Sequence, residues 1–397
     1  MLNPDLRPTN AAPEAHAPLR SGSHDAVLAE LSSILFTSFS RSDQCRKGMQ
    51  YLRGLLETQG RKSIRNIAAT LLGERISEQN LHHFISDSTW DWVPLRRALA
   101  HHLMSVSPPQ AWVVQPIVIP KAGRHSVGVD KHFFPGLGQV LNAQRAVGVW
   151  AVSQEATAPV NWRLHLPKAW LKDDLRRSQV SIPDGADVET LSECVTEAFL
   201  ESMTEWQLPI RPVVINSCET QALAVFEKLG STGIPLLVKA SGDLRLTTAG
   251  SGLPAHGGRP LSAYQIMNLV KEMRRPVIEK DPDRETAHQR CFTAAVRVCV
   301  PTPPGQPGDS RELLLLGVGE EGEPWPACLW LTNLTTTSPA ALTRLIKLTE
   351  KVNRDFAEIS DRVGIRDFTG RSFSGWHRHV TLASAAHAVV SLADQDR

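Results

Sequence analysis

Few side chains in this sequence combine the types and the spacing that chemistry on a bound molecule requires. Asp130 and His132 stand two residues apart in the apolar run SVGVDKHFF, so on a β-strand they would share one face. A carboxylate and an imidazole in that arrangement could pass a proton to a substrate, or they could form a salt pair at the surface. Lys121 and Cys218 are two further groups that a metal-independent reaction on a small molecule could use.

The sequence shows no pattern of metal ligands. Its six cysteines contain no closely spaced CxxC pair, which argues against a zinc knuckle and against a disulfide scaffold. His377 and His379 in GWHRHV have no third ligand nearby, and a polar cap at a helix start is the role that we expect for them. We predict free thiols in a reducing cytoplasm, with no metal and no cofactor.

Composition limits the classes of protein to consider. The 397 residues are 42% hydrophobic and 21% charged, which is typical of a globular protein with two or three domains. The formal net charge is +2, from 43 basic and 41 acidic side chains, so any surface for nucleic acid must be local. The chain has no run of about eighteen apolar residues and no basic start before an apolar stretch, so we predict neither a membrane span nor a secretory signal.

The first part of the chain has the pattern of helices. Residues 1–24 are rich in Pro, Ala, Asn, Ser and His and are predicted to be a disordered tail. In residues 25–107 apolar side chains recur at helical spacing, which predicts a helical domain of four or five segments. Its helices are expected within residues 24–39, 45–60, 62–74 and 92–106.

From Pro108 onward the pattern changes to short β-rich runs bounded by Gly, Pro or polar residues. The expected strands fall within residues 111–119, 126–134, 143–153 and 158–167, and three successive strands of this kind should form an antiparallel meander. Asp173 and Asp174 should begin a helix, because their charge is favourable at its positive end. A long helix is then expected within residues 187–206.

The order of the later elements predicts an α/β fold. A strand, a helix and a strand are expected within residues 210–216, 219–233 and 234–241, an alternation typical of a mixed sheet with helices on its faces. We therefore predict that residues 108–241 form the first part of a mixed core. The remaining predicted segments are a β-containing insertion at 242–335, C-terminal helices that complete the core at 336–392, and a tail at 393–397.

In five separate segments, and in the same order, the chain resembles insertion-sequence transposases of the DDE superfamily. These segments are YLRGLLETQGRKSIRNIAATLLG, LHHFISDSTWDWVPLRRAL, VIPKAGRHSVGVDKHFFPGLGQVLNAQRAVGV, RLHLPKAWLKDDLRRSQVSIP and GWHRHVTLASAAHAVV. The likeness covers the chain from about Ser40 to Leu392. It implies a ribonuclease-H-like core and an ancestry in metal-dependent cutting and joining of DNA.

The resemblance also assigns three positions to catalytic carboxylates. In that family two strands end with the two Asp residues and a late helix carries the Glu, and the corresponding residues here are Gln115, Asn216 and Asn353. If the third position is displaced slightly, Asp355 or Glu350 takes its place. Neutral amides cannot supply the charged oxygens that two divalent cations require, so the resemblance implies a protein without metal-dependent nuclease activity.

A cluster of basic side chains could contact DNA. These are Arg46, Lys47, Arg53, Arg61, Lys62 and Arg65 in the helical domain, with Lys121, Arg124 and Lys131 beside the first catalytic strand. Such cations would pair with phosphates in a salt-dependent way. The alternative is a solvated helix face without a partner.

Two functions remain open from the sequence. The first is a catalytically inactive, domesticated transposase-like protein that acts as a DNA-binding or regulatory protein. The second is a transposase-fold enzyme that acts on a small-molecule ligand without metal, through groups such as Lys121, Asp130, His132 or Cys218. The first function predicts DNA as the partner and the second a small molecule. Both leave a homodimer open, and neither involves a membrane.

Overall fold

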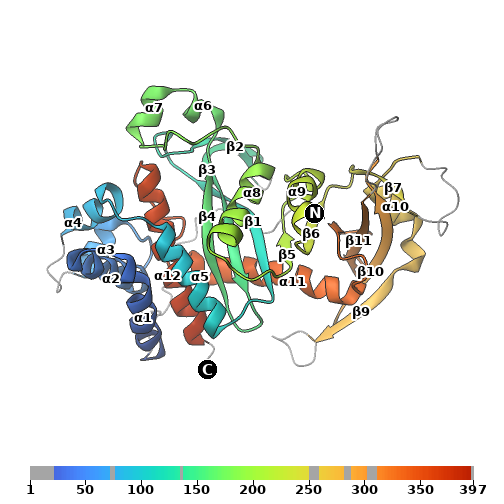
Figure 1. The fold of residues 1–397 in the computed structure, drawn as a ribbon, viewed down its shortest axis with the longest axis horizontal. Helices are drawn as coiled ribbons and strands as arrows, with labels where there is room; N and C mark the ends of the chain where they lie inside the picture. Colours follow the sequence, from blue (N-terminus) through green and yellow to red (C-terminus); the bar gives the residue numbers. More distant parts are fainter. Residues whose placement is uncertain are drawn as a thin grey trace. The chain divides into compact units, whose positions relative to one another are not determined.

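The computed structural model describes residues 22–71, 77–134, 137–249, 259–280, 288–301 and 311–394 (Figure 1). The chain forms two compact units. One comprises residues 2–209 and 351–397 and is called the terminal unit, because it contains the C-terminal end and nearly all of the N-terminal half. The other comprises residues 210–350 and is called the central unit.

The terminal unit begins with helices, as predicted. They are α1 (Gly22–Leu35), α2 (Ser42–Glu57), α3 (Ile64–Thr70), α4 (Glu78–His82) and α5 (Val93–Val106). Ser63 and Ser77 cap α3 and α4, because each hydroxyl accepts a hydrogen bond from the backbone N–H three residues later. Helix α1 starts three residues before the predicted Asp25, and residues 1–21 of the predicted tail lie outside the described residues.

Four antiparallel strands follow in the terminal unit. They are β1 (Ala111–Pro120), β2 (Asp130–Phe134), β3 (Gln139–Val152) and β4 (Thr157–His165). Strand β3 is long enough to pair with each of the other three strands, so it connects the whole of this sheet. The predicted strands are confirmed, and the three successive strands β2, β3 and β4 form the predicted antiparallel meander, while β1 pairs with β3.

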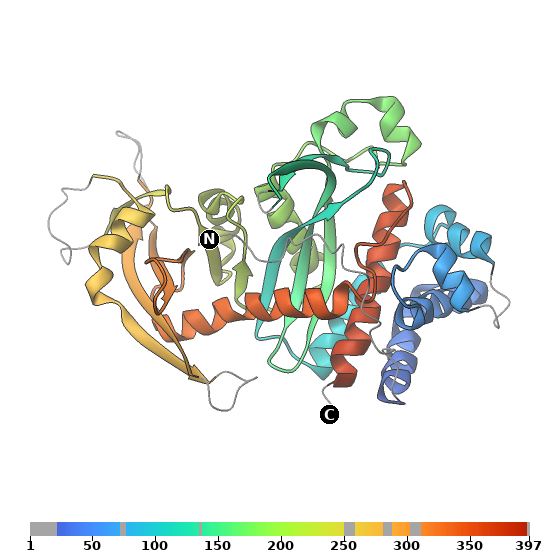
Figure 2. The same ribbon diagram turned by 180° about the vertical axis from the view of Figure 1, so that it is seen from behind.

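Helix α12 (Phe373–Ala393) forms the middle of the terminal unit. Figure 2 shows it between the N-terminal helices and the sheet, where it contacts α1, α2 and β4. All its residues from Gly375 to Ala393 are buried. Helix α8 (Leu191–Leu200) also packs on β4, which explains why nearly every residue of this strand is buried.

Two short helices, α6 (Lys168–Leu171) and α7 (Asp174–Gln179), follow β4. The carboxylate of Asp173 accepts a hydrogen bond from the Arg176 backbone N–H at 3.0 Å, so the predicted acidic helix start is confirmed. Helix α8 continues as a single π-helical segment, η4 (Glu201–Glu205). Helix α8 and the segment η4 together form the long helix predicted within residues 187–206.

The central unit contains the predicted strand–helix–strand alternation. Strands β5 (Val213–Ile215) and β6 (Leu236–Ala240) are parallel and are connected by α9 (Ala222–Leu229). Strand β6 pairs on its other side with β12 (Cys328–Thr332). Strand β12 pairs in turn with β11 (Glu312–Glu320). The parallel pair is expected, because a crossover helix joins its strands.

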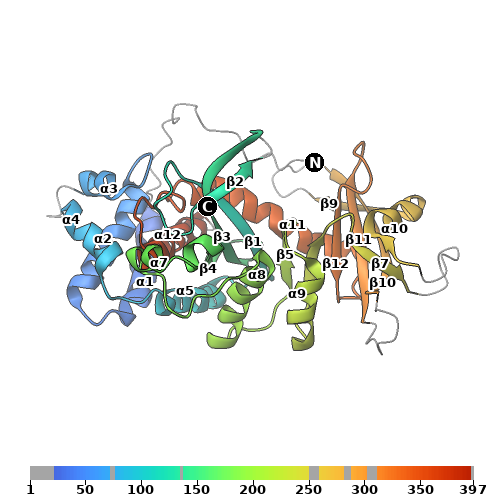
Figure 3. The same cartoon turned by 90° about the horizontal axis from the view of Figure 1, so that it is seen from above.

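The rest of the central unit is a β-rich region that Figure 3 shows from above. Strand β10 (His288–Cys299) pairs with β11, with β9 (Arg275–Lys280) and with β7 (Arg245–Thr248). Strand β7 pairs with the two-residue β8 (Leu261–Ser262). Helix α10 (Ala263–Leu269) packs on β10 and β11.

The sequence did not predict the strands β7, β8 and β9. Strands β7 and β8 are short, and β9 is interrupted by a proline and carries charges, so none of them has a clear apolar alternation. Helix α11 (Pro339–Asp355) and the π-helical segment η7 (Phe356–Ser360) precede α12. The predicted mixed α/β class, with helices at both ends of the chain and a β-containing insertion, is confirmed. Within the described residues, no helix is long and apolar enough to cross a membrane.

Candidate functional site

Gln115 occupies the position that the resemblance assigns to the first carboxylate. It is buried in the middle of β1, where it pairs with Gly148 of β3. The expected placement at the end of the strand is wrong, because pairing with β3 continues through Pro116 to Pro120. The amide therefore lies within the sheet of the terminal unit.

Asn216, at the second position, directly follows β5 and is half-buried. Its Oδ1 atom accepts a hydrogen bond from the Nζ atom of Lys239 at 3.2 Å. Lys239 lies on β6, the parallel neighbour of β5, and its ammonium is 5.9 Å from the ring centroid of Trp330. The amide oxygen thus already contacts a cation that belongs to the protein.

Of the four cysteines in the central unit, Cys218 follows Asn216 by two residues and Cys328 begins β12, which pairs with β6. Cys218 is exposed, and the Sγ atom of Cys328 accepts a hydrogen bond from the indole of Trp330 at 3.3 Å. Burial raises the pKa of the Cys328 thiol, although the Trp330 hydrogen bond and the charge of Lys239 act in the opposite direction. A protonated thiol is a weak nucleophile, so Cys328 is not arranged for covalent catalysis.

Asn353, at the third position, is half-buried in the last turn of α11. Of the two alternatives, Glu350 is exposed, whereas Asp355 is buried. The carboxylate of Asp355 accepts a hydrogen bond from the Thr157 hydroxyl and forms an ion pair with Lys351 at 3.3 Å. This carboxylate is therefore occupied within the terminal unit.

The side chains at these positions do not fit a two-metal site. Divalent magnesium and manganese require several charged oxygens, and the three positions offer neutral amides. The amide oxygen of Asn216 already accepts from an ammonium, and Asp355, two residues after Asn353, is paired with Lys351. Among the residues that the structure describes, no group of three or more His, Cys, Asp and Glu side chains could hold a metal ion.

The predicted DNA-contacting cations differ in exposure. The exposed ones are Arg46, Arg61, Arg65, Arg124 and Lys131. Lys47 and Arg53 are half-buried on α2, where Lys47 pairs with Asp43 at 3.4 Å. Arg61 approaches Asp367 at 4.0 Å.

Lys62 and Lys121 point into the terminal unit. The ammonium of Lys121 donates to the carbonyl oxygens of Phe368 at 2.8 Å and Arg366 at 3.4 Å, and that of Lys62 donates to the carbonyl of Thr58. Burial lowers the pKa of each amine to about 8, while the charge of Asp367 opposes this shift. Both amines therefore donate to backbone carbonyls inside the protein, and they are poorly placed to contact DNA phosphates.

Arg124 and Lys131 line a small basic pocket of about 150 Å³. The other residues that line it are Val129, Asp130, Asn142, Ala169 and Arg176. Arg176 is held by stacking, since its guanidinium carbon lies 4.4 Å from the ring centroid of Trp170. The pocket thus brings three cations together with one carboxylate at the junction of β2, β3 and α6–α7.

Of the four groups proposed for small-molecule chemistry, only Asp130 lines either of the two described pockets. Asp130 and His132 share one face of β2, as predicted, but only Asp130 lines the basic pocket. A second pocket of about 410 Å³ includes Asp91, Arg97, His101, Glu205 and Trp206 and none of the four groups. The acid–imidazole pair therefore has no enclosed substrate space at these two pockets.

The sequence reading also missed a polar network inside the terminal unit. The buried Arg96 of α5 donates to Asn161 Oδ1 at 2.9 Å, to the Trp162 carbonyl at 2.7 Å and to His377 Nδ1 at 3.0 Å. His379 donates from Nε2 to the Gly364 carbonyl at 2.8 Å and accepts from the Tyr51 hydroxyl at 2.8 Å. The expected cap role of His377 and His379 is wrong, because Ser372 caps α12 and both imidazoles are buried.

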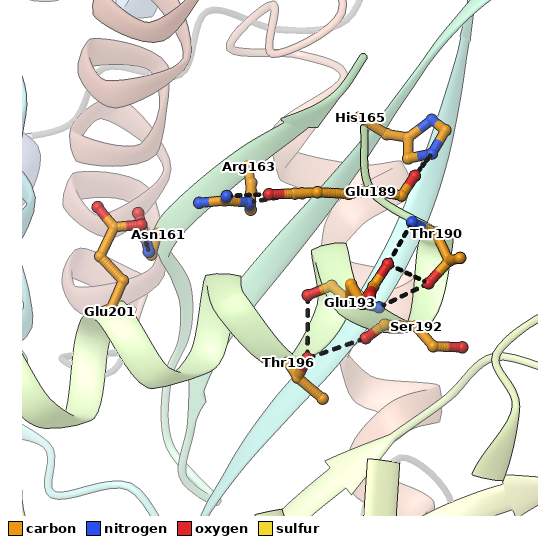
Figure 4. Close-up of polar contacts among 9 residues, drawn as sticks. All are labelled: Asn161, Arg163, His165, Glu189, Thr190, Ser192, Glu193, Thr196 and Glu201. Atoms are coloured by element: carbon orange, nitrogen blue, oxygen red, sulfur yellow. Dashed lines mark hydrogen bonds and ion pairs between the residues drawn. The ribbon is translucent and has the colours of Figure 1, made fainter. Parts of the chain in front are cut away.

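Figure 4 shows a second polar cluster, on β4 and α8. Arg163 binds the Glu189 carboxylate through two hydrogen bonds, one of them 3.0 Å long, and His165 donates to the Glu189 carbonyl at 3.1 Å. Burial alone would lower the pKa of Arg163, but the hydrogen bonds and charge of Glu189 outweigh it and raise the pKa. Thr190 and Glu193 form a capping box at the start of α8. The cluster fixes α8 to the sheet.

Comparison with known proteins gives the family. A family model described as DDE superfamily endonuclease matches residues 34–297. No curated protein matches the chain. The match covers more than half of the sequence, and it includes the segments of β1 to β6 that hold Gln115 and Asn216. The chain therefore belongs to the DDE superfamily of endonucleases.

Proposed function

We propose that this DDE-superfamily protein binds DNA without cutting or joining it and acts as a regulatory protein. The observation that carries the proposal is the hydrogen bond from Lys239 to the amide oxygen of Asn216. A cation of the protein itself contacts the oxygen at the position that the resemblance assigns to a metal-binding carboxylate. A second positive ion at that oxygen would be repelled by the ammonium.

In this proposal the protein has no nuclease or strand-transfer activity, because the charges that would hold the metal ions are missing. Phosphoryl transfer depends on cations that neutralise charge on the phosphate, and ionised carboxylates hold those cations. A single amide could leave residual turnover, whereas amides at all three positions remove the ligand set. Asp355, two residues after Asn353, does not replace it, because its Oδ2 atom already accepts a hydrogen bond from Thr157 and pairs with Lys351.

The DNA-binding part of the proposal rests on the family and on exposed cations. Members of an endonuclease family must contact nucleic acid, and Arg46, Arg65, Arg124 and Lys131 are exposed on the terminal unit. Cations of this kind bind phosphates by releasing condensed counterions, which makes affinity fall steeply with salt. The near-neutral net charge restricts this binding to such local surfaces.

A nicking assay tests the absence of cleavage. Supercoiled plasmid is incubated with the full-length protein and either Mg²⁺ or Mn²⁺, and nicked and linear forms are measured. We expect no metal-dependent product. Asn216→Ala is the matched control, since nicking that persists in this variant comes from a contaminating nuclease. Metal-dependent nicking by the natural protein that Asn216→Ala abolishes would refute the proposal.

Fluorescence anisotropy with labelled DNA tests binding. We expect binding at low salt, with a logarithmic affinity that falls linearly as the logarithm of the salt concentration rises. The measurement is made without divalent ions, so it is independent of cleavage. No binding to single-stranded or duplex DNA at low salt would contradict the DNA-binding function.

A further inference from the structure

The strands β2 and β3 form a ribbon with an unusual open face. Lys131 pairs with Asn142 and Phe133 pairs with Val140, and residues two apart on a strand share a face. These four side chains therefore lie together. Phe133 and Val140 are each 54% exposed, so a large apolar pair is in contact with solvent.

Part of the opposite face of the ribbon is packed against the protein. Phe134 and Ala143 on that face are 1% and 2% exposed. The ribbon therefore has a defined inner side, and Phe133 and Val140 cannot turn inward without a change of strand register. Their exposure is a property of the fold.

The open face leads directly into the basic pocket. Lys131 and Asn142 belong to both, and Arg124 and Arg176 complete the set of polar donors. The pocket volume of about 150 Å³ is below the range of drug-sized ligand sites, which begins at about 300 Å³. It suits a single small anionic group better than a whole metabolite.

The pocket is prepared for an anion before binding. Arg176 lies over Trp170, whose indole donates to the Val129 carbonyl at 2.9 Å, so the planar guanidinium has a fixed support. Stacked guanidinium groups keep their N–H edges available for phosphate oxygens. Asp130 is the one carboxylate, and its Oδ1 accepts from the Lys131 backbone N–H at 2.8 Å, so the three cations outweigh it.

We propose that the β2–β3 ribbon binds a DNA strand, with one backbone phosphate in the basic pocket and a neighbouring unpaired base against Phe133 and Val140. This inference rests on the proposed function and names the surface that performs it. Phosphate complements the three cations, and the flat face of a base complements an exposed aromatic ring. A duplex with closed base pairs would satisfy only the pocket.

Anisotropy titrations of the full-length protein with a labelled 20-nucleotide single strand and the matching blunt duplex test the inference. We expect Lys131→Ala and Arg124→Ala each to weaken single-strand binding by about fivefold to tenfold and to lower the salt slope by about one. Phe133→Ser should weaken single-strand binding by about tenfold without changing the salt slope. The same variant should change duplex binding less than about twofold, because paired bases do not reach the ring.

Two variants serve as controls. Lys271→Ala removes an exposed cation from the central unit, and Val106→Ser removes a 44% exposed apolar side chain at the end of α5. Both should bind like the natural protein. Photocrosslinking to a strand that contains 5-iodouracil, followed by mass spectrometry, should place the crosslink on the ribbon.

Distinct outcomes overturn the inference. If the natural protein binds DNA but the ribbon variants bind equally well, the ribbon assignment fails while the proposed function stands. Equal loss on single strand and duplex in Phe133→Ser would exclude the contact with an unpaired base. Tighter binding to RNA of the same sequence would replace DNA as the partner. A dimer in sedimentation that Phe133→Ser dissociates would show that a second copy covers the face.

Discussion

The ammonium nitrogen of Lys239 lies 3.2 Å from the side-chain oxygen of Asn216, one strand away in the parallel pair β5–β6. Both residues belong to the central unit. The Lys239 ammonium lies 5.9 Å from the ring of Trp330. An uncharged amide and a lysine therefore share the space next to β5, at the position that the resemblance assigns to a metal-binding carboxylate.

This pair predicts the effect of restoring one carboxylate. Asn216→Asp should form an ion pair with Lys239 and stabilise the fold by about 0.5–1 kcal/mol, because a half-buried pair gains little from charge. Thermal unfolding of Asn216→Asp should show no further stabilisation on addition of Mn²⁺. The double variant Asn216→Asp with Lys239→Met should lose the stabilisation that the ion pair provides. A large rise in the melting temperature of Asn216→Asp on addition of Mn²⁺ would mean that the lysine does not block the position.

Arg96 predicts a large loss of stability. Arg96→Met would remove the buried guanidinium that donates to the Trp162 carbonyl, to Asn161 and to His377, and we expect a loss of about 3–5 kcal/mol in the free energy of unfolding. Arg96→Lys should recover only part of this, since lysine cannot donate in several fixed directions. The neighbouring exposed Arg97→Met is the matched control in urea unfolding, and an equal effect of both changes would contradict a role for the network.

Two buried histidines predict a loss of stability in mild acid. Burial lowers the pKa of His379 and of His387 to about 4, although Asp367 and Asp355 act in the opposite direction. The unfolded chain, with an ordinary pKa near 6.5, binds protons that the folded protein does not bind. Stability is therefore full above about pH 6.5 and falls as the pH drops towards 4.

The expected loss is about 2 kcal/mol for each histidine between pH 7 and pH 5. Urea unfolding at both pH values measures it. His387→Gln should reduce the pH dependence by about its own share, whereas the exposed His125→Gln should leave it unchanged. A pH dependence that is the same in all three proteins would show that His387 is not held neutral.

The capping box at the start of α8 predicts a smaller effect. Thr190→Ala removes the hydroxyl that accepts from the Glu193 backbone N–H at 3.2 Å and should cost about 1 kcal/mol. Thr190→Ser should retain the cap and most of the stability. Equal unfolding midpoints for Thr190→Ala and the natural protein would contradict the role of the cap (Figure 4).

Much of the secondary structure was predictable because it depends on local patterns. The apolar spacing of α2 and α5, the β-rich runs of β1 to β4 and the alternation of β5, α9 and β6 are all visible in the sequence. Asp173 is a further example, since its helix-capping role needs only its neighbours. The short strands β7 to β9 were missed, because their pairing with β10 and with each other stabilises them more than any pattern of their own.

The candidate site was less predictable than the fold. The sequence identified Arg124 and Lys131, but Arg176 joins their pocket from a helix some fifty residues later in the chain. It grouped Lys62 and Lys121 with the DNA-contacting cations, whereas both amines turn inward to backbone carbonyls. No local sequence pattern distinguishes a lysine at the surface from one whose amine donates to backbone carbonyls inside the protein.

The sequence by itself determined the superfamily resemblance, the order of elements and the presence of amides at the three assigned positions, because each depends on residue identity and spacing along the chain. Only the tertiary structure decided that Lys239 faces Asn216, that the buried Arg96 contacts His377 of α12, and that Phe133 lies exposed beside a basic pocket. These features join residues distant in sequence, and burial and electrostatics act through space.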